Sequence, residues 1–484
     1  MAETTNKKQD KLERQRQNKL SEIKELQIDP YGGRYKKTEP AESIRQRFAD
    51  AKEGQRARCA GRIILLRDIG KLIFITLRDW SGTIQIGLSK KMLTDSWKLA
   101  KLLELGDIIG TEGQLGKTKT GEITIWSENL SLLSKSLLQP PEKFHGLADI
   151  DQRYRQRYID LWANPEVMSV FKKRSAIISA IRRSLHNKGF LEVETPMMQK
   201  VPGGAAAKPF ITHHNTLDMD LYLRIAPELF LKRLLVGGME KVFEINRNFR
   251  NEGLSRQHNP EFTMLELYQA YGNYNDMMKL TEQLICELIK EHCETEKIKF
   301  NDMEIDYTQP WKKASYAELL KKYSGCDFED IQAVRKKAGQ LEIEHQNMDD
   351  VVVINEVFEH TVEDNLINPT FVVDYPAEIC PLTKPKKEDK RFAERFELFI
   401  GGMEVANAYS ELNDPAVQEE NFKKQLRGQE DSMAKMDEDF ITALKYGMPP
   451  AGGLGIGIDR LIMVLTGAES IREVILFPLL REKT

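Results

Sequence analysis

The 484-residue sequence has no apolar stretch that approaches the roughly 18 residues of a membrane-spanning helix. Residues 1–10 are polar and lack the apolar segment of a secretory signal. The five cysteines show neither paired nor metal-ligand spacing, so we expect free thiols in a reducing compartment. These absences predict a cytoplasmic protein that uses no membrane, no disulfide framework and no cysteine-bound metal.

A strong excess of one charge is also missing. Lysine and arginine number 71, aspartate and glutamate number 74, and the formal net charge is −3. Any nucleic acid would therefore bind to a local patch rather than to a uniformly basic surface. The first 58 residues are slightly basic, which a solvated helix explains as well as contact with RNA does.

The first third of the chain predicts a small β-barrel behind a helical extension. Residues 1–57 are charged and show partial helical spacing of apolar residues. Residues 58–138 contain five β-rich segments separated by turn signals, with one helix expected over 91–105. This order is typical of the OB-fold, a barrel that binds oligonucleotides. Residues 139–165 predict a linker.

The remaining residues, 166–484, mix helices and strands without strict alternation. We expect an α+β domain with an antiparallel sheet and flanking helices. The pattern predicts helices over 167–188, 226–235, 275–292 and after 459, and strands over 241–249, 262–271, 371–375, 395–400 and 404–410. A charged, helix-prone stretch at about 297–364 indicates a helical insertion.

Two short motifs carry the chemical signal. In Phe249-Arg250-Asn251-Glu252 a cation and an anion stand two residues apart, so on a strand they point to the same side. Residues 453–460 (GLGIGIDR) predict a glycine-spaced turn that brings Arg460 close to a bound group. Together the motifs indicate a pocket that holds a phosphate and an amine.

These motifs resemble motifs 2 and 3 of the class II aminoacyl-tRNA synthetases, and residues 189–196, which end at Pro196, resemble motif 1. Asp459 replaces the Glu of many class II families, as is common in the subgroup for Lys, Asp and Asn. Longer segments are similar to bacterial-type lysyl-tRNA synthetases: 202–210, 225–229, 250–253, 258–263 and 407–414. The resemblance extends from about residue 10 to the C-terminus, with Lys208 where the family more often has Arg.

The resemblance implies ATP-dependent attachment of L-lysine to tRNA(Lys) through a lysyl-adenylate, by a homodimer that uses Mg²⁺. The lysine carboxylate would attack the α-phosphorus of ATP, and a ribose hydroxyl of the tRNA would then take the lysyl group. Such transfers depend on positioning and on charge stabilisation. They need no covalent enzyme intermediate, and the sequence shows no Ser–His–Asp or Cys–His pattern.

The resemblance also assigns the ATP end of the site. Arg250 would bridge the lysine carboxylate and the α-phosphate, because a guanidinium can hold two oxygens at once. Phe262 and Arg460 would enclose the adenine, and His258 would contact the terminal phosphates. The implied ATP-binding residues are Arg250, Glu252, His258, Phe262, Glu397 and Arg460. Of these, Arg250, Glu252 and Arg460 would be catalytic, and Glu397 and Glu404 would bind Mg²⁺.

The lysine end is assigned in the same way. Glu228 and the Gly204 carbonyl would take the α-ammonium, and Asn407 would hold the carboxylate beside Arg250. The ε-ammonium would bind Glu266, Glu411 and the Tyr268 hydroxyl. Two buried acids are unfavourable unless a cation opposes them. A site for aspartate would need an additional Arg or Lys, and the sequence shows none at matching positions.

The barrel is expected to read the anticodon, with Phe74 stacking on a base and Arg67, Gln85 and Glu128 contacting base edges. Three alternatives remain open. One is an aspartyl or asparaginyl enzyme, against which Glu266 and Glu411 argue. Another is a synthetase paralogue that lysylates a protein, against which the barrel argues. The last is a non-catalytic RNA-binding module, which would have no use for an ATP site.

Overall fold

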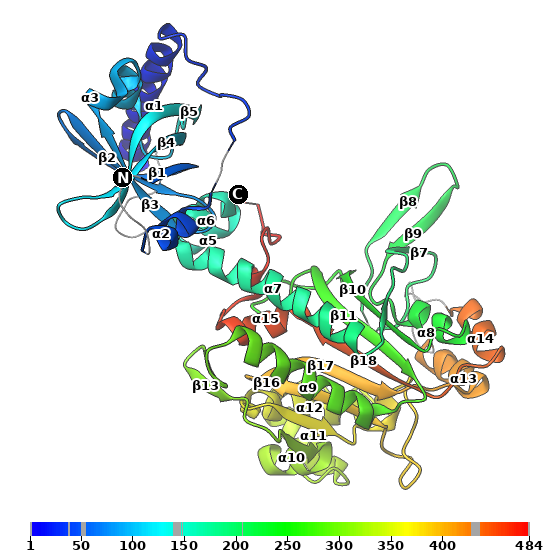
Figure 1. Cartoon of the computed structure of the whole chain (residues 1–484). Helices are drawn as coiled ribbons and strands as arrows, with labels where there is room; N and C mark the ends of the chain where they lie inside the picture. Colours follow the sequence, from blue (N-terminus) through cyan, green and yellow to red (C-terminus); the bar gives the residue numbers. More distant parts are fainter. Residues whose placement is uncertain are drawn as a thin grey trace. The chain divides into compact units, whose positions relative to one another are not determined.

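The computed structural model describes residues 2–36, 39–49, 55–138, 147, 149–205, 207–426 and 436–482. The chain forms two compact units, Met1–Ala148 and Asp149–Thr484 (Figure 1). Among the described residues, no helix combines the length and the apolar character that crossing a membrane requires. The finer domain boundaries of the sequence analysis stay predictions.

The first unit is a closed barrel of five strands in the order β1-β2-β3-β5-β4. The strands are β1 (Arg56–Ile69), β2 (Leu72–Arg78), β3 (Thr83–Ser89), β4 (Ile108–Lys117) and β5 (Ile123–Ser134). Alternate residues such as Ile73, Ile75 and Ile86 are buried inside it. The predicted OB-fold is confirmed.

Helices surround this barrel. The N-terminal pair is α1 (Ala2–Glu25) and α2 (Ala41–Ala49). The helix predicted over 91–105 is broken into α3 (Lys90–Leu93), the 3₁₀ turn η1 (Thr94–Ser96) and α4 (Trp97–Leu102). The break coincides with Thr94, whose positive φ of 31° no α-helix accommodates.

The second unit is built on one eight-stranded sheet in the order β14-β15-β16-β17-β18-β11-β10-β6. Its strands are β6 (Leu191–Glu192), β10 (Lys241–Phe249), β11 (Glu261–Ala270), β14 (Lys312–Ser315), β15 (Thr370–Val373), β16 (Arg395–Ile400), β17 (Met403–Ser410) and β18 (Ala451–Gly457). The strands from β15 to β10 pair antiparallel, as predicted, whereas both edge strands pair parallel.

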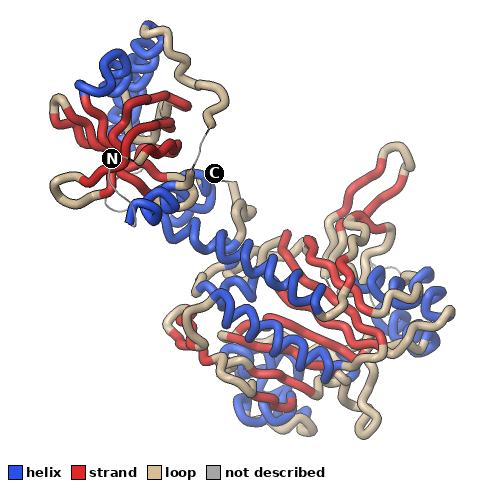
Figure 2. Tube along the Cα trace, viewed as in Figure 1, coloured by secondary structure: helices blue, strands red, loops and turns tan. Residues whose placement is uncertain are grey.

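Three helices cover one face of this sheet: α7 (Pro165–Asn187), α9 (Tyr274–His292) and α15 (Ile458–Thr466) (Figures 1 and 2). Proline stands at the first position of α7, and Asn273 with Asp276 forms a capping box at the start of α9. Strand residues such as Phe243, Leu265 and Leu454 pack against these helices. The apolar side chains therefore occupy one face, and the alternate residues of the same strands form a polar opposite face.

Smaller elements complete the second unit. They are α5 (Ile150–Arg155), α6 (Arg157–Ala163), α8 (Glu228–Val236), α13 (Pro415–Leu426), α14 (Glu438–Lys445), α16 (Ile471–Val474) and the 3₁₀ turn η3 (Ala377–Ile379). A separate three-stranded sheet contains β7 (Met198–Gln199), β8 (Ile211–His214) and β9 (Met219–Leu223).

The segment 297–364 is not the purely helical insertion that the sequence suggested. It contains α10 (Tyr316–Ser324), α11 (Ile331–Gln340), α12 (Asp350–Val362) and the start of the 3₁₀ turn η2 (Glu363–Asn365). It also contains the strand pair β12 (Lys297–Phe300) and β13 (Met303–Asp306), and β14 joins the main sheet. Tyr316 and Phe358 stack with ring centres 4.0 Å apart in a core that includes Val372 and Phe399 of the sheet. These strands are too short to show a clear period of two.

Two local predictions about the motifs are wrong. Residues 453–457 form the strand β18 in the middle of the sheet rather than a turn, and α15 follows directly. Arg250 and Glu252 do not lie on a strand, because β10 ends at Phe249. In both cases neighbouring elements, rather than local propensity, determine the backbone.

Asp459 fixes the start of α15. One carboxylate oxygen accepts the Thr263 backbone N–H at 2.7 Å, and the other pairs with Arg174 at 2.6 Å. The acid is almost fully buried and is satisfied by both contacts. It thereby joins α15 to β11 and α7 and sets the position of the neighbouring Arg460.

Candidate active site

The floor of the site is a strip of bare backbone on β18. A Cβ atom at Gly453 would lie 1.9 Å from Glu411 Oε1 and 2.6 Å from the Tyr268 ring. At Gly455 it would lie 3.1 Å from Asn407 Oδ1. Only glycine leaves room for these side chains, which come from the elements on either side of β18.

A pocket opens beside this floor, between the loop after β10 and the start of α15. It is lined by seven of the predicted site residues: Arg250, Glu252, His258, Phe262, Glu404, Asn407 and Arg460. The Arg250 guanidinium carbon lies 5.2 Å from the centre of the Phe262 ring. The structure therefore brings five of the six predicted ATP-binding residues together in one pocket, whose lining does not include Glu397.

Arg460 makes other contacts in this pocket. Its Nη1 donates to the Glu404 backbone carbonyl at 2.8 Å, and its Nη2 lies 2.9 Å from His258 Nε2. Burial and then the positive charge of Arg460 lower the pKa of His258. Since its ordinary pKa is already near 6.5, His258 is a neutral ring at pH 7 that can accept a hydrogen bond from Arg460.

The two acids predicted to bind a metal lie on the hairpin of β16 and β17, which turns at Gly401 and Gly402. Glu404 accepts a hydrogen bond from Asn407 Nδ2 at 2.8 Å and lines the pocket. Glu397 is half-buried, with 12% of its side chain exposed; it pairs with Arg395 and accepts the Tyr375 hydroxyl at 2.6 Å. Burial raises the pKa of Glu397, an effect that Arg395 opposes and Glu404 reinforces.

Glu397 and Glu404 suit a Mg²⁺ ion that also binds phosphate oxygens and water. The described residues contain no cluster of three or more acidic, histidine or cysteine side chains arranged for a metal ion. Mg²⁺ commonly takes one or two carboxylates and completes its shell with phosphate oxygens and water. Glu404, with Glu397 behind it, fits that donor set, whereas a site made wholly of protein ligands does not fit.

The other end of the site is closed and acidic. Glu228, Glu266, Tyr268 and Glu411 are each at most 8% exposed. The Tyr268 hydroxyl donates to Glu266 across 3.5 Å, the long limit for a hydrogen bond. Burial, with a further contribution from Glu228, raises the pKa of Glu266 to about 8. Glu228, Glu266, Tyr268 and Glu411 thus lie together, in surroundings that disfavour the negative charge of Glu266.

Gly204 lies against Glu228, as the sequence analysis expected. Its φ is +87°, and a Cβ atom there would lie 3.0 Å from the Glu228 Cβ. The left-handed backbone and the close approach both require glycine. The carbonyl of this residue can therefore come close to whatever Glu228 binds.

A cation at this end was missed. Lys232, one turn after Glu228 on α8, is fully buried, and its Nζ lies 2.6 Å from Glu228 Oε1. It also forms an ion pair with Glu411. The prediction that no additional Lys or Arg would lie here is wrong. The spacing of Glu228 and Lys232 on an otherwise apolar turn was the available signal, because a lysine is rarely buried without a partner.

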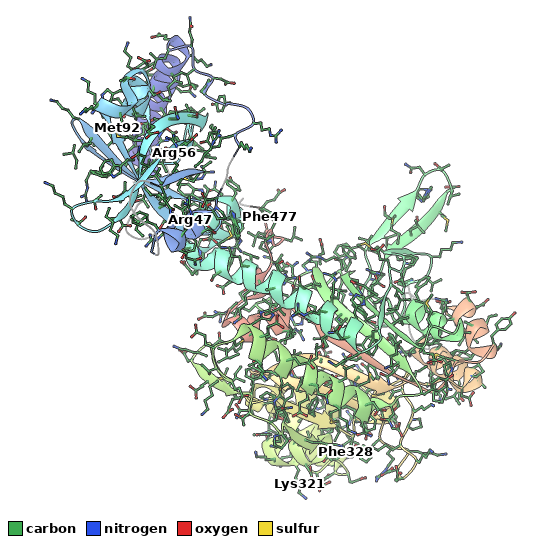
Figure 3. The ribbon with its side chains drawn as sticks, viewed as in Figure 1. Arg47, Arg56, Met92, Lys321, Phe328 and Phe477 are labelled. Carbon is green, nitrogen blue, oxygen red and sulfur yellow. The ribbon has the colours of Figure 1, made fainter. Side chains whose placement is uncertain are left out.

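On the barrel, the predicted anticodon residues share one region of the outer surface. Phe74 and Gln85 alternate with buried residues of β2 and β3, and Arg67 is the β1 partner of Phe74. Gln85 accepts a hydrogen bond from Thr124 at 2.8 Å. Glu128 pairs with Arg56 at 2.8 Å, and Figure 3 labels Arg56 on the barrel.

Trp126 belongs to the same surface and was missed as a functional residue. Its ring meets Phe74 edge to face, with centres 5.9 Å apart. A Cβ atom at Gly87 would lie 2.6 Å from this ring, and one at Gly116 would lie 3.3 Å away. Two glycines therefore make space for the indole. Its place next to the buried Ile125 in the strand pattern was the signal that it faces outward.

Comparisons with known proteins agree with this geometry. Residues 149–481 match the family model "tRNA synthetases class II (D, K and N)", and residues 57–133 match "OB-fold nucleic acid binding domain". A lysine–tRNA ligase of Pelotomaculum thermopropionicum is 54% identical, over 98% of this chain and 95% of that protein. The lysine–tRNA ligase of Carboxydothermus hydrogenoformans is 53% identical, over 97% of each chain. That of Staphylococcus epidermidis is 48% identical, over 97% of this chain and 98% of that protein.

The glycine floor predicts a stability effect. Gly453→Ala should lower the free energy of unfolding by about 1–3 kcal/mol, because the added carbon displaces Glu411 and Tyr268. Gly457→Ala on the same strand is the matched control, since its nearest new contact is an ordinary 3.7 Å. Chemical denaturation measures both variants, and equal losses would contradict the assignment.

Proposed function

The chain belongs to the class II tRNA synthetases of the D, K and N group, and from this membership we propose that it attaches L-lysine to tRNA(Lys) in an ATP-dependent reaction. The observation that favours lysine is the closed acidic end, where Glu228, Glu266 and Glu411 lie together and the ammonium of Lys232 pairs with only two of them, Glu228 and Glu411. A substrate with two ammonium groups supplies the missing positive charge. The negatively charged side chain of aspartate would instead be repelled.

In the first step, an oxygen of the lysine carboxylate attacks the α-phosphorus of ATP, and pyrophosphate leaves. In the second, a ribose hydroxyl of the tRNA attacks the carbonyl of the adenylate, and AMP leaves. Arg250 is suited to the first step because its guanidinium lies at the Phe262 ring in the pocket that Asn407 also lines. Its Nε is buried and finds no hydrogen-bond acceptor among the described residues, so a donor is available for the substrate.

The other roles follow from the contacts. Glu252 and His258 line the phosphate side of the pocket with Arg460, and Phe262 offers its ring to the adenine. Mg²⁺ would be held by Glu404 with Glu397, and it would offset the charge of the phosphate oxygens. Glu228, the Gly204 carbonyl, Glu266, Tyr268 and Glu411 would bind the two ammonium groups. These assignments rest on proximity and charge.

Further parts of the proposal concern partners. The outer barrel surface around Phe74 and Trp126, with Arg67, Gln85 and Glu128, suits single-stranded bases that stack and present their edges. We assign this surface to the anticodon. A homodimer and a cytoplasmic location are proposed on the family resemblance alone.

Amino-acid-dependent exchange between ATP and pyrophosphate tests the function directly. We expect exchange with lysine and none with aspartate or asparagine, because neither brings the second ammonium. Arg250→Ala should lose the exchange while its thermal unfolding stays close to that of the natural protein. A folded natural protein that shows no lysine-dependent exchange would refute the proposal.

The barrel surface gives a separate prediction. Phe74→Ala and Trp126→Ala should each lower the kcat/KM of tRNA charging about tenfold or more, the effect of losing one stacked base. Neither should change lysine-dependent exchange, which takes place in the other unit. Met92→Ala, at an exposed apolar position on α3 of the same barrel (Figure 3), is the control and should leave charging unchanged. A loss of exchange would identify a structural role instead.

The pKa of Glu266 predicts a pH dependence. With a pKa of about 8 this acid is mostly protonated at pH 7 in the empty site. Binding of an ammonium group to the carboxylate releases that proton. The KM for lysine should therefore fall as the pH rises from about 6.5 to 8, by up to tenfold per pH unit.

Exchange kinetics across this pH range measure the effect. Glu266→Gln is the control, because an amide has no proton to release and its pH dependence should be flatter. The neighbouring Glu411, whose pKa burial raises to about 7, accounts for any residual slope below pH 7. A KM for lysine that stays constant in the natural protein would count against a role for Glu266 in ammonium binding.

A further inference from the structure

The ammonium of Lys232 joins two carboxylates that come from different parts of the second unit. Glu228 lies on the same helix, α8, and Glu411 directly follows β17. Lys232 Nζ is 2.6 Å from Glu228 Oε1 and also pairs with Glu411 Oε2. Lys232 and Glu411 are both completely inaccessible to solvent. One side chain therefore links helix and sheet behind the proposed lysine site.

This arrangement leaves part of Glu411 available to a ligand. Its Oε1 lies against Gly453 and near the Tyr268 ring, and has no hydrogen-bond donor within the described part of the chain. A buried carboxylate oxygen without a donor is rare in folded proteins. Lys232 thus holds one oxygen of Glu411 while the other faces the residues assigned to the substrate's ε-ammonium.

Lys232 also sets the charge of the group. Burial lowers the pKa of a lysine, but here Glu228 and Glu411 raise it above its ordinary value, so the ammonium persists. Burial raises the pKa of Glu411 to about 7, and Lys232 opposes that rise. Removal of the ammonium would push this pKa higher, and Glu411 would be protonated at neutral pH. Glu411 could then no longer offer a negative charge to the substrate.

The geometry fixes a distance as well. Two oxygens that bind one ammonium lie at most about 6 Å apart. Glu228 is assigned to the α-ammonium and Glu411 to the ε-ammonium, so the spacing of these two acceptors depends on Lys232. A substrate whose two ammonium groups are spaced differently from those of lysine fits the held acceptors less well.

We propose that Lys232 is a positioning residue for amino-acid selection, which keeps Glu411 charged and holds Glu228 and Glu411 at the spacing that suits the two ammonium groups of lysine. It acts through these carboxylates and not by contact with the substrate. The inference rests on the proposed function and adds a residue that determines its specificity.

Lys232→Met tests the inference in the exchange assay. The KM for lysine should rise about tenfold or more, which is the effect of losing one charged hydrogen bond, while the KM for ATP stays within about twofold. The preference for lysine over ornithine should also fall. Lys232→Arg keeps the charge and should recover part of the affinity for lysine.

Arg233→Met is the matched control. This residue is the next on α8 and pairs with Asp437 at 2.7 Å, and neither partner is assigned to the site. It reports the loss of an ion pair from the same helix, and the KM for lysine should not change. A folded Lys232→Met protein with an unchanged KM for lysine would overturn the inference. Equal rises in the KM values for lysine and ATP would overturn it too.

If the Lys232→Met protein does not fold, a second pair of variants tests the same inference. The double variant Lys232→Met/Glu228→Gln carries one buried carboxylate fewer, so it should fold more readily. Its KM for lysine should exceed that of Glu228→Gln alone, and equal values would refute the role of Lys232. A natural protein without lysine-dependent exchange would instead refute the proposed function.

Discussion

The arrangement of the second unit depends on the interactions that allow three carboxylates to be buried in it. Glu228, Glu266 and Glu411 lie where water cannot stabilise their charge, and such groups persist only when cations or hydrogen bonds oppose them. Lys232 opposes two of them. The raised pKa values of Glu266 and Glu411, about 8 and about 7, are the physical sign that positive charge is still lacking. These acids therefore favour a cation beside them, which agrees with the proposed binding of lysine.

The strand β18 makes room for the buried carboxylates because glycines alternate along it with large apolar residues. Gly453 and Gly455 face the site, where any side chain would collide with the acids or with Asn407. Leu454 and Ile456 face the opposite side and are part of the core under α7, α9 and α15. Because the side-chain period of a strand is two, one short sequence supplies both a bare floor and a packed anchor. The rigidity of the site thus derives from the core beneath it.

The sequence allowed much of this to be predicted, and the errors share a cause. Strands with regular alternation, such as 241–249, and the motif residues around Arg250 were identified because their signal is local. The glycines of β18 suggested a turn, since the reason for them lies on neighbouring strands. Lys232 was overlooked because Glu411, one of its two partners, is 179 positions away in the chain. Trp126 was taken as a strand residue because its outward direction depends on the barrel register.

The two ends of the site are connected by one rigid strand, which bears on how specificity arises. Asn407 on β17 donates to Glu404 at the ATP end, and Glu411, four residues further on, pairs with Lys232. At about 3.3 Å per residue the strand separates these points by about 13 Å. Hydrogen bonds in the sheet hold that separation, so the proposed acceptors for the amino acid are positioned relative to those proposed for the nucleotide before either ligand binds. Selection of the amino acid then requires little rearrangement of the protein. The carboxylates are fixed in advance, and an amino acid that lacks a matching ammonium group leaves one of them unpaired and therefore binds more weakly.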